Sequence, residues 1–169
     1  MKQSLKNVKE FSIRAKDGKK GKVKDFLFDE EAWIIRYLHG DFGNWLKSKK
    51  ILLPRVFLGK PEWEEEVFPV EITSDMIEKG PDIDDHMPVS REYEAELMKF
   101  YNLDPYWPYT YTGTAGGGLF FPPRPLVPPK GEDIEVKTKL RSFKEVKGYA
   151  IRTKDEKIGK VDDLIFDDE

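Results

Sequence analysis

One long stretch of this chain occurs twice. Residues 13–31 read IRAKDGKKGKVKDFLFDEE, and residues 151–169 read IRTKDEKIGKVDDLIFDDE, which is a displacement of 138 positions. Twelve of the 19 aligned positions are identical, and the likeness extends back to Leu5 and Phe143. Self-similarity at a fixed distance indicates a repeated structural unit. We therefore expect the two stretches to adopt the same local fold.

The first copy and the residues after it have the pattern of short β-strands. Residues 5–31 read as two strands around a turn. In the second of these strands, Val23 and Leu27 share one face, whereas Phe26 and Phe28 share the other. A strand that is apolar on both faces is typical of a barrel or a sandwich. Further strands, rich in β-branched and aromatic residues, are expected at 33–38, 51–58 and 67–72.

The glycines of the repeated stretch differ in how they recur. Gly18 is replaced by Glu156 in the second copy, so its position does not strictly require a left-handed backbone. Gly21 recurs as Gly159. A glycine retained inside a strand indicates a bulge or a close approach of other atoms to the backbone. We therefore expect the Gly21 position to be crowded.

Two short helices follow the strands. Thr73 is the expected N-cap of the first helix, and Ser90 is the expected N-cap of the second. In the second helix the spacing of the apolar residues predicts one buried face, with Glu94 on the exposed side. The residues of that face are Tyr93, Leu97, Phe100 and Tyr101.

The composition then changes abruptly. The segment 105–131 contains seven of the 12 prolines and five of the 13 glycines, which is typical of a linker. We therefore expect three parts. These are a β-domain at 5–108, a Pro/Gly-rich linker at 109–139, and the first hairpin of an incomplete second repeat at 140–169.

Five sequence runs identify a family resemblance. They are GKVKDFLFDEEAWIIRYL at 21–38, GNWL at 43–46, KKILLP at 49–54, MPVSREYEAEL at 87–97 and DPYW at 104–107. In this order they resemble the PRC-barrel family, the small β-barrel shared by the photosynthetic reaction-centre H subunit and the ribosome maturation factor. The chain is thus similar to a tandem member whose second copy is truncated. The resemblance implies a mainly β fold, a PRC-type barrel with two short helices, used as a docking or assembly module without chemistry of its own.

Charge and composition narrow the function classes further. The 29 basic and 32 acidic side chains give a net charge of −3, and both signs are interleaved. This pattern favours a mixed solvated surface over the basic stripe of a nucleic-acid binder. There is no cysteine, no apolar leader at the N-terminus and no apolar run of membrane-spanning length. We expect a cytoplasmic protein without membrane insertion.

Polar clusters offer weak candidates for catalysis or metal binding. Asp82, Asp84, Asp85 and His86 could supply ligands to Ca²⁺ or Mg²⁺, but they lack the spacing of a calcium loop. His39 with Asp41 could be an acid–base pair, although we expect both in a turn. A solvated loop accounts for each group more simply. We therefore predict no enzymatic activity, no cofactor and no metal site.

Aromatic residues are the better candidates for function, because interface centres are enriched in them. Trp33 and Trp45 fit the barrel core, and Trp107 also fits the docking of a helix. The candidate interaction surface comprises Trp63, Tyr106, Trp107, Tyr109 and Tyr111.

The leading hypothesis is a module that binds another protein or its own copies. An isolated hairpin is marginally stable, so we also expect a homodimer through residues 143–169. The alternative is an RNA- or ribosome-associated assembly factor, and a photosynthetic reaction-centre-like accessory role is remote. Both alternatives come from the resemblance alone, and direct nucleic-acid binding is not expected. The partner's identity does not follow from the sequence.

Overall fold

The computed structural model describes residues 2–43, 49–83, 89–107 and 138–167. The chain divides into two compact units. The sheet unit comprises Met1–Met87 and Lys139–Glu169, and the α3 unit comprises Pro88–Thr138.

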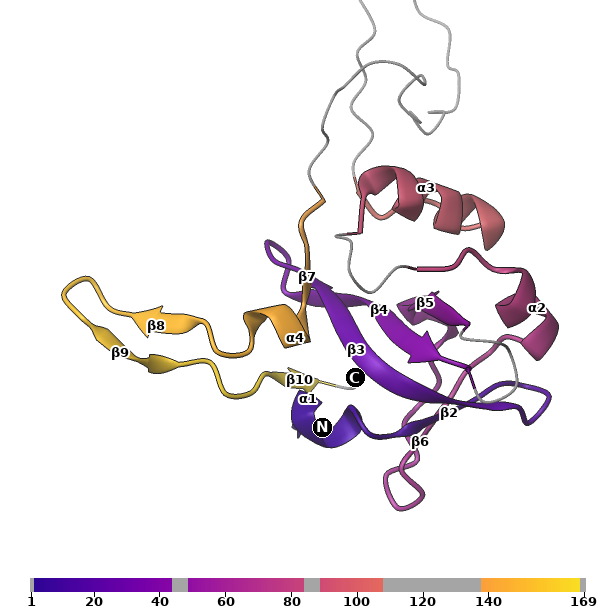
Figure 1. Cartoon of the computed structure of the whole chain (residues 1–169), viewed down its shortest axis with the longest axis horizontal. Helices are drawn as coiled ribbons and strands as arrows, with labels where there is room; N and C mark the ends of the chain where they lie inside the picture. Colours follow the sequence, from indigo (N-terminus) through magenta and orange to yellow (C-terminus); the bar gives the residue numbers. More distant parts are fainter. Residues whose placement is uncertain (1, 44–48, 84–88, 108–137, 168–169) are drawn as a thin grey trace, which may run out of the picture. The chain divides into compact units, whose positions relative to one another are not determined.

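The sheet unit is built around six paired strands, with the order β5-β4-β3-β2-β6 and with β7 paired to β3 (Figure 1). Strand β3 is the longest, and β4 lies antiparallel along nearly all of it. The strand bounds are β2 (Ser12–Arg14), β3 (Lys20–Asp29), β4 (Ile34–Asp41), β5 (Lys50–Pro54), β6 (Val67–Pro69) and β7 (Leu140–Ser142).

The segments that follow β5 and surround β6 are joined by individual backbone hydrogen bonds and not by a continuous β-ladder. After β5 the chain turns into a 3₁₀ helix, η1 (Arg55–Phe57). The Gly59 N–H donates to the Pro69 carbonyl at 2.9 Å, and the Glu71 N–H donates to the Phe57 carbonyl at 2.8 Å. Pro54 and Pro69 end their strands without a donor of their own. The sequence predicts a closed barrel, but among the described residues the strand pairing does not close into a ring.

The predicted helices are present with their predicted caps. Helix α2 (Ser74–Lys79) starts after Thr73, whose side chain accepts from Met76 N–H, and α3 (Arg91–Phe100) starts after Ser90, whose side chain accepts from Tyr93 N–H. The predicted face of α3 is partly wrong. Its buried residues include Leu97, Met98, Tyr101 and Glu94, whereas Phe100 is 36% exposed.

Two further helices, not expected from the sequence, open the two repeats. Helix α1 (Leu5–Val8) follows β1 (Lys2–Ser4), and α4 (Phe143–Val146) follows β7. The local reason is a serine N-cap: Ser4 accepts from Asn7 N–H, and Ser142 accepts from Glu145 N–H. The start of the repeat is therefore a strand and one helical turn, where a longer strand was predicted.

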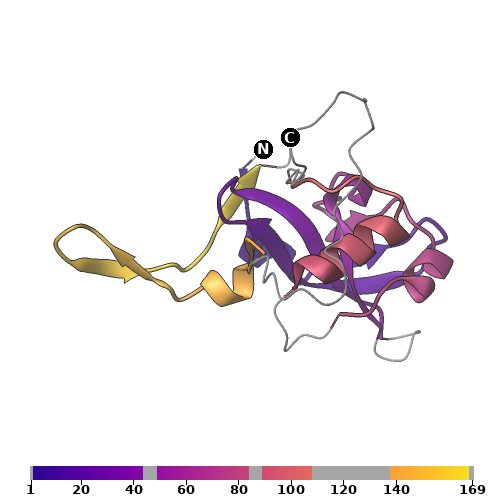
Figure 2. The same ribbon diagram turned by 90° about the horizontal axis from the view of Figure 1, so that it is seen from above.

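The second repeat adopts the element order of the first, 138 residues later. Residues 140–167 contain β7, α4, β8 (Ala150–Arg152), β9 (Lys157–Lys160) and β10 (Ile165–Asp167). These correspond to β1, α1, β2 and the two halves of β3. The β8–β9 hairpin expected from the sequence is present, and it extends away from the six-stranded sheet (Figures 1 and 2).

The repeats exchange their first elements. Strand β1 pairs with β10 in the register Ser4↔Ile165, and β7 pairs with β3 in the register Leu27↔Ser142. Subtracting 138 turns one register into the other, so the two contacts are equivalent. We call residues 2–8 the first arm and residues 140–146 the second arm. Each arm lies on the other repeat.

Hydrogen bonds to two aspartate side chains follow the same exchange between the repeats. The Ser142 hydroxyl and the Lys144 N–H donate to the carboxylate of Asp25, which is 6% exposed. At the equivalent positions, the Ser4 hydroxyl and the Lys6 N–H donate to Asp163. Phe143 of the second arm is 1% exposed. The two repeats therefore complete each other through their arms within one chain.

Candidate functional site

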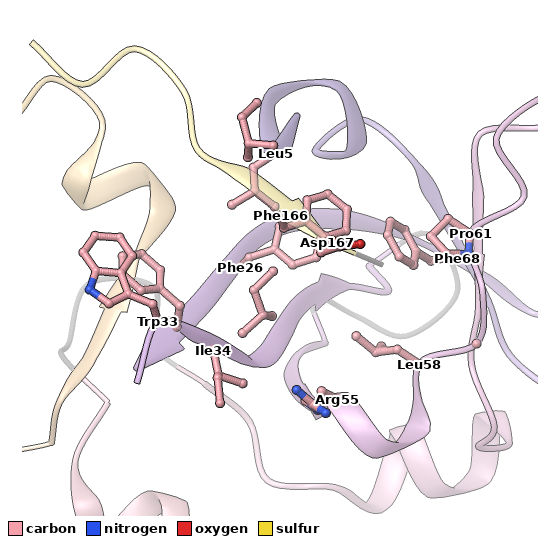
Figure 3. A pocket seen from close by; sticks show the side chains of 14 residues that line it. Leu5, Phe26, Trp33, Ile34, Arg55, Leu58, Pro61, Phe68, Phe166 and Asp167 are labelled. Carbon is pink, nitrogen blue, oxygen red and sulfur yellow. The ribbon is translucent and has the colours of Figure 1, made fainter. Parts of the chain in front are cut away.

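A groove of about 470 Å³ opens within the sheet unit, between β10 of the second repeat and the β3–β4 and η1 segments of the first (Figure 3). Most of its lining is apolar, and Arg55 and Asp167 are the charged side chains. The remaining lining residues are Leu5, Phe26, Phe28, Trp33, Ile34, Ile35, Leu58, Gly59, Pro61, Phe68, Ile165 and Phe166.

The tight turn between β3 and β4 positions Trp33 at one end of the groove. The carboxylate of Asp29 accepts the N–H groups of Glu31 and Ala32 at 2.9 and 3.0 Å, and the Asp29 carbonyl accepts Trp33 N–H at 2.8 Å. Burial alone would raise the pKa of Asp29, but these N–H bonds and the Arg36 guanidinium lower it below its ordinary value. The carboxylate therefore stays charged and fixes the turn.

Trp33 itself is held in an unusual conformation. Its φ is 54°, in the left-handed region that bulky residues rarely adopt. Its ring stacks on Phe28, with centroids 5.5 Å apart and an angle of 21° between the planes. The side chain nevertheless remains 68% exposed, so the expected core position of Trp33 is wrong. A strained backbone that presents a large exposed aromatic is more typical of a binding site than of a core.

The floor of the groove joins the two repeats. Phe26 of β3 packs against Phe68 of β6 at 6.0 Å and against Phe166 of β10 at 6.4 Å. Phe26 and Phe68 are buried, whereas the neighbouring Ile165 is 63% exposed. The exchanged β1–β10 pair is what brings β10 to this place. The groove thus depends on residues more than 130 positions apart in the chain.

Arg55 is the cation of the groove. It begins η1, directly after the buried strand β5, and its side chain is exposed. In the described part of the chain, no carboxylate forms an ion pair with it. The next residue, Val56, is 63% exposed but does not line the groove. Asp167 adds a carboxylate to the same lining, so Arg55 is the groove side chain that favours a negative charge on an otherwise apolar ligand.

The residues predicted as an interaction surface belong to different parts of the chain. Trp63 lies in the sheet unit, half-buried, with its ring edge-on to Phe11 at 5.6 Å. Tyr106 and Trp107 belong to the α3 unit. Tyr109 and Tyr111 lie outside the described residues, as do Trp45, Asp84, Asp85 and His86. His39 and Asp41, expected in a turn, belong to β4.

Tyr106 and Trp107 fold back on α3. The Arg91 guanidinium carbon lies 4.3 Å from the centroid of the Trp107 ring, and Arg91 Nη1 lies 2.9 Å from Glu94 Oε2. The Tyr106 hydroxyl donates to Glu94 Oε1 at 2.7 Å, and burial together with the Glu94 carboxylate raises the pKa of Tyr106. The cluster gives the two aromatics a role within the α3 unit. Their participation in an interface stays a prediction.

Comparison with known proteins identifies one domain. Residues 3–77 match the family model described as the PRC-barrel domain. No curated protein matches the chain. The matched segment contains residues 3–8 of the first arm and β2 to β6, together with the turn that carries Trp33. Among the helices of the described residues, none is long and apolar enough to cross a membrane.

Sequence reasoning missed the residues of the groove. Trp33 was assigned to the core, and Arg55 and Phe166 were not singled out. The available signal was the cluster Asp29-Glu30-Glu31 directly before Trp33, which favours a turn there and hence an exposed ring. Nothing in the local sequence indicates that Phe166 meets Phe26.

Proposed function

We propose that the chain is a non-enzymatic assembly module that binds another protein through its PRC-barrel domain. The PRC-barrel domain at residues 3–77 supports this role, because the family resemblance implies docking. The observation that carries the proposal is Trp33, which stands 68% exposed over an apolar groove. Tryptophan is among the residues most enriched at the energetic centres of interfaces.

The groove favours one kind of occupant. Its buried aromatic floor and the exposed Trp33 and Ile165 suit large apolar side chains. Arg55 adds a cation at its margin, which suits a carboxylate. We therefore take the partner to offer an extended segment with an apolar anchor and an acidic residue beside it.

The same proposal includes the nature of the second repeat. We take residues 140–167 as the beginning of a second PRC-type repeat, because its elements and arm contacts match those of the first at a distance of 138 residues. In this interpretation the groove is a composite of two repeats. A partner that fills it would contact both of them.

Selection from a library of short random peptides displayed on phage tests the proposal. The selected peptides are expected to contain both a large apolar residue and an acidic residue. They should lose at least about tenfold in affinity when Trp33 is replaced by Ser, because a central aromatic anchor is lost. Arg55→Ala should weaken the acidic peptides most. Val56→Ser is the matched control, since Val56 is equally exposed but lies off the groove.

Two results would contradict the proposal. One is selected peptides that bind Trp33→Ser and the unchanged chain equally well. The other is tight binding of single-stranded RNA that collapses between low and moderate salt, which is the signature of phosphate contacts. That result would favour the RNA-associated alternative.

A further inference from the structure

Equivalent residues of the two repeats differ in exposure. Ile13 is fully buried, but its equivalent Ile151 is 42% exposed. Leu27 is 7% exposed, but its equivalent Ile165 is 63% exposed. The exposed apolar residues of the second repeat are Tyr149, Ile151, Ile158 and Ile165. An apolar face of this kind indicates that something else covers it.

The first repeat shows what covers the positions equivalent to Ile151 and Ile165. Strand β4 pairs antiparallel with β3 and continues into Phe42, which is fully buried. In the described part of the chain, β9 pairs only with β8, and β10 pairs only with β1. The edge of the second repeat that corresponds to the β4 side of β3 therefore has no strand beside it within the described residues. Such an edge accepts a further strand readily.

A glycine provides a second, independent observation. A Cβ atom added to Gly21 would lie 2.6 Å from two ring carbons of Phe42 and 2.9 Å from the Asp41 carbonyl oxygen, so the close approach predicted there is confirmed. At its equivalent Gly159, no atom of the described residues lies within 4 Å of such a Cβ. A glycine in a strand is costly unless another group comes close. An aromatic ring placed as Phe42 is placed would supply that group.

The charges of β9 argue against a second chain as the occupant. Its sequence is Lys157-Ile158-Gly159-Lys160. If two β9 strands paired antiparallel about their centre, Lys157 of each chain would face Lys160 of the other, and like charges directly opposite are destabilising. In the first repeat, Lys22, the equivalent of Lys160, faces Asp41. The occupant should therefore carry an acidic residue at this position.

We propose that β9 and β10 form an acceptor for a partner's β-strand of the β4 type. This strand pairs antiparallel with residues 157–167 and carries the pattern of Leu38 to Phe42. That pattern is a large apolar residue, then one intervening residue, a glycine, an aspartate and an aromatic residue whose ring lies over Gly159. The inference rests on the proposed role in protein binding, but it names a different surface, which shares only β10 with the groove.

Titration of the full ¹⁵N-labelled chain with a peptide of residues 33–54 tests the inference. This peptide contains the β4 sequence and Phe42. The expected result is saturable change of the backbone resonances of residues 157–167. Phe42→Ala in the peptide should weaken binding. Gly159→Val in the chain should weaken it at least about tenfold, since the new side chain occupies the place of the ring. Lys154→Val, in the exposed turn of the same hairpin, should leave the affinity unchanged.

Three outcomes would overturn the inference. The resonances of 157–167 could remain unchanged at excess peptide, or Gly159→Val could bind the peptide as well as the unchanged chain does. The third is sedimentation of the chain alone as a dimer with protected amides at 157–160, which would make a second chain the occupant. Gly159 does not line the groove, so peptides selected through Trp33 should still bind Gly159→Val. The two proposals therefore fail separately.

Discussion

The exchange of arms predicts which segment each of two aspartates holds. Asp25→Ala removes the carboxylate that accepts from Ser142, Lys144 and Phe26 N–H. Asp163→Ala removes the equivalent carboxylate, which accepts from Ser4, Lys6 and Leu164 N–H. Asp25→Ala should therefore release the second arm at 140–146, and Asp163→Ala should release the first arm at 2–8. Neither arm is close in sequence to the residue that holds it.

The expected magnitudes follow from burial. Asp25 is 6% exposed, and its loss leaves a hydroxyl and two N–H groups without their charged acceptor. Bonds to charged groups contribute about 1.5–3 kcal/mol each, and partial access of water reduces the sum. We expect Asp25→Ala to lower the free energy of unfolding by about 2–4 kcal/mol. Asp163 is half-buried, so water replaces more of what is lost and about 1–2 kcal/mol is expected.

Urea denaturation measures the two free energies, and amide hydrogen exchange locates the released segment. Asp155→Ala is the control, because Asp155 lies in the exposed turn between β8 and β9, and it should change stability by less than about 0.5 kcal/mol. Faster exchange at 140–146 in Asp163→Ala instead of Asp25→Ala would refute the exchanged pairing. Equal losses for all three variants would refute the role of the carboxylates.

Two further predictions concern crowding and pH. Gly21→Ala should lower the free energy of unfolding by about 1–3 kcal/mol in urea denaturation, because its Cβ meets the Phe42 ring and the Asp41 carbonyl. Gly159→Ala should change it by less than about 0.5 kcal/mol, and equal costs for the two variants would contradict the open space at Gly159 among the described residues. The Ser74 hydroxyl lowers the pKa of Asp17, and the Lys6 ammonium lowers the pKa of Asp162. The midpoint of urea denaturation should therefore stay constant above about pH 4 and decrease as the pH falls through the lowered pKa values. The decrease should be smaller in Asp162→Asn. A midpoint that increases below about pH 4 would contradict this prediction.

Local patterns predicted the parts of the fold that local chemistry decides. Thr73 and Ser90 cap their helices as predicted, because a side-chain oxygen beside free N–H groups is a local arrangement. The crowding at Gly21 also followed from the sequence, since the glycine is kept in both repeats. The repeat itself predicted equal element order in its two copies, and the structure has it. Each of these features depends on residues near one another in the chain or on a comparison of the chain with itself.

Other features depend on partners distant in sequence. Glu94 falls on the polar side of α3 by spacing alone, but Arg91 and Tyr106 neutralise and bind its carboxylate, so it is fully buried. Trp33 is exposed because the bonds of Asp29 tighten the turn before it. The composite groove could not be predicted either, because the arm exchange pairs residues 111 to 165 positions apart. Periodicity carries no information about such pairings.

The exchange of arms also explains why the second repeat can keep exposed apolar residues while both repeats remain folded. The arm contacts use Ser4, Asp25 and their equivalents, and these are retained in both repeats and bonded in both. The contacts with β4 involve a different edge of β3 and Gly21, and among the residues that the structure describes the second repeat makes no equivalent contacts. Docking of the arms and coverage by a β4-type strand are therefore separate interactions on opposite edges. If a partner strand docks as we propose, it would join or leave β9 and β10 without disturbing the arms.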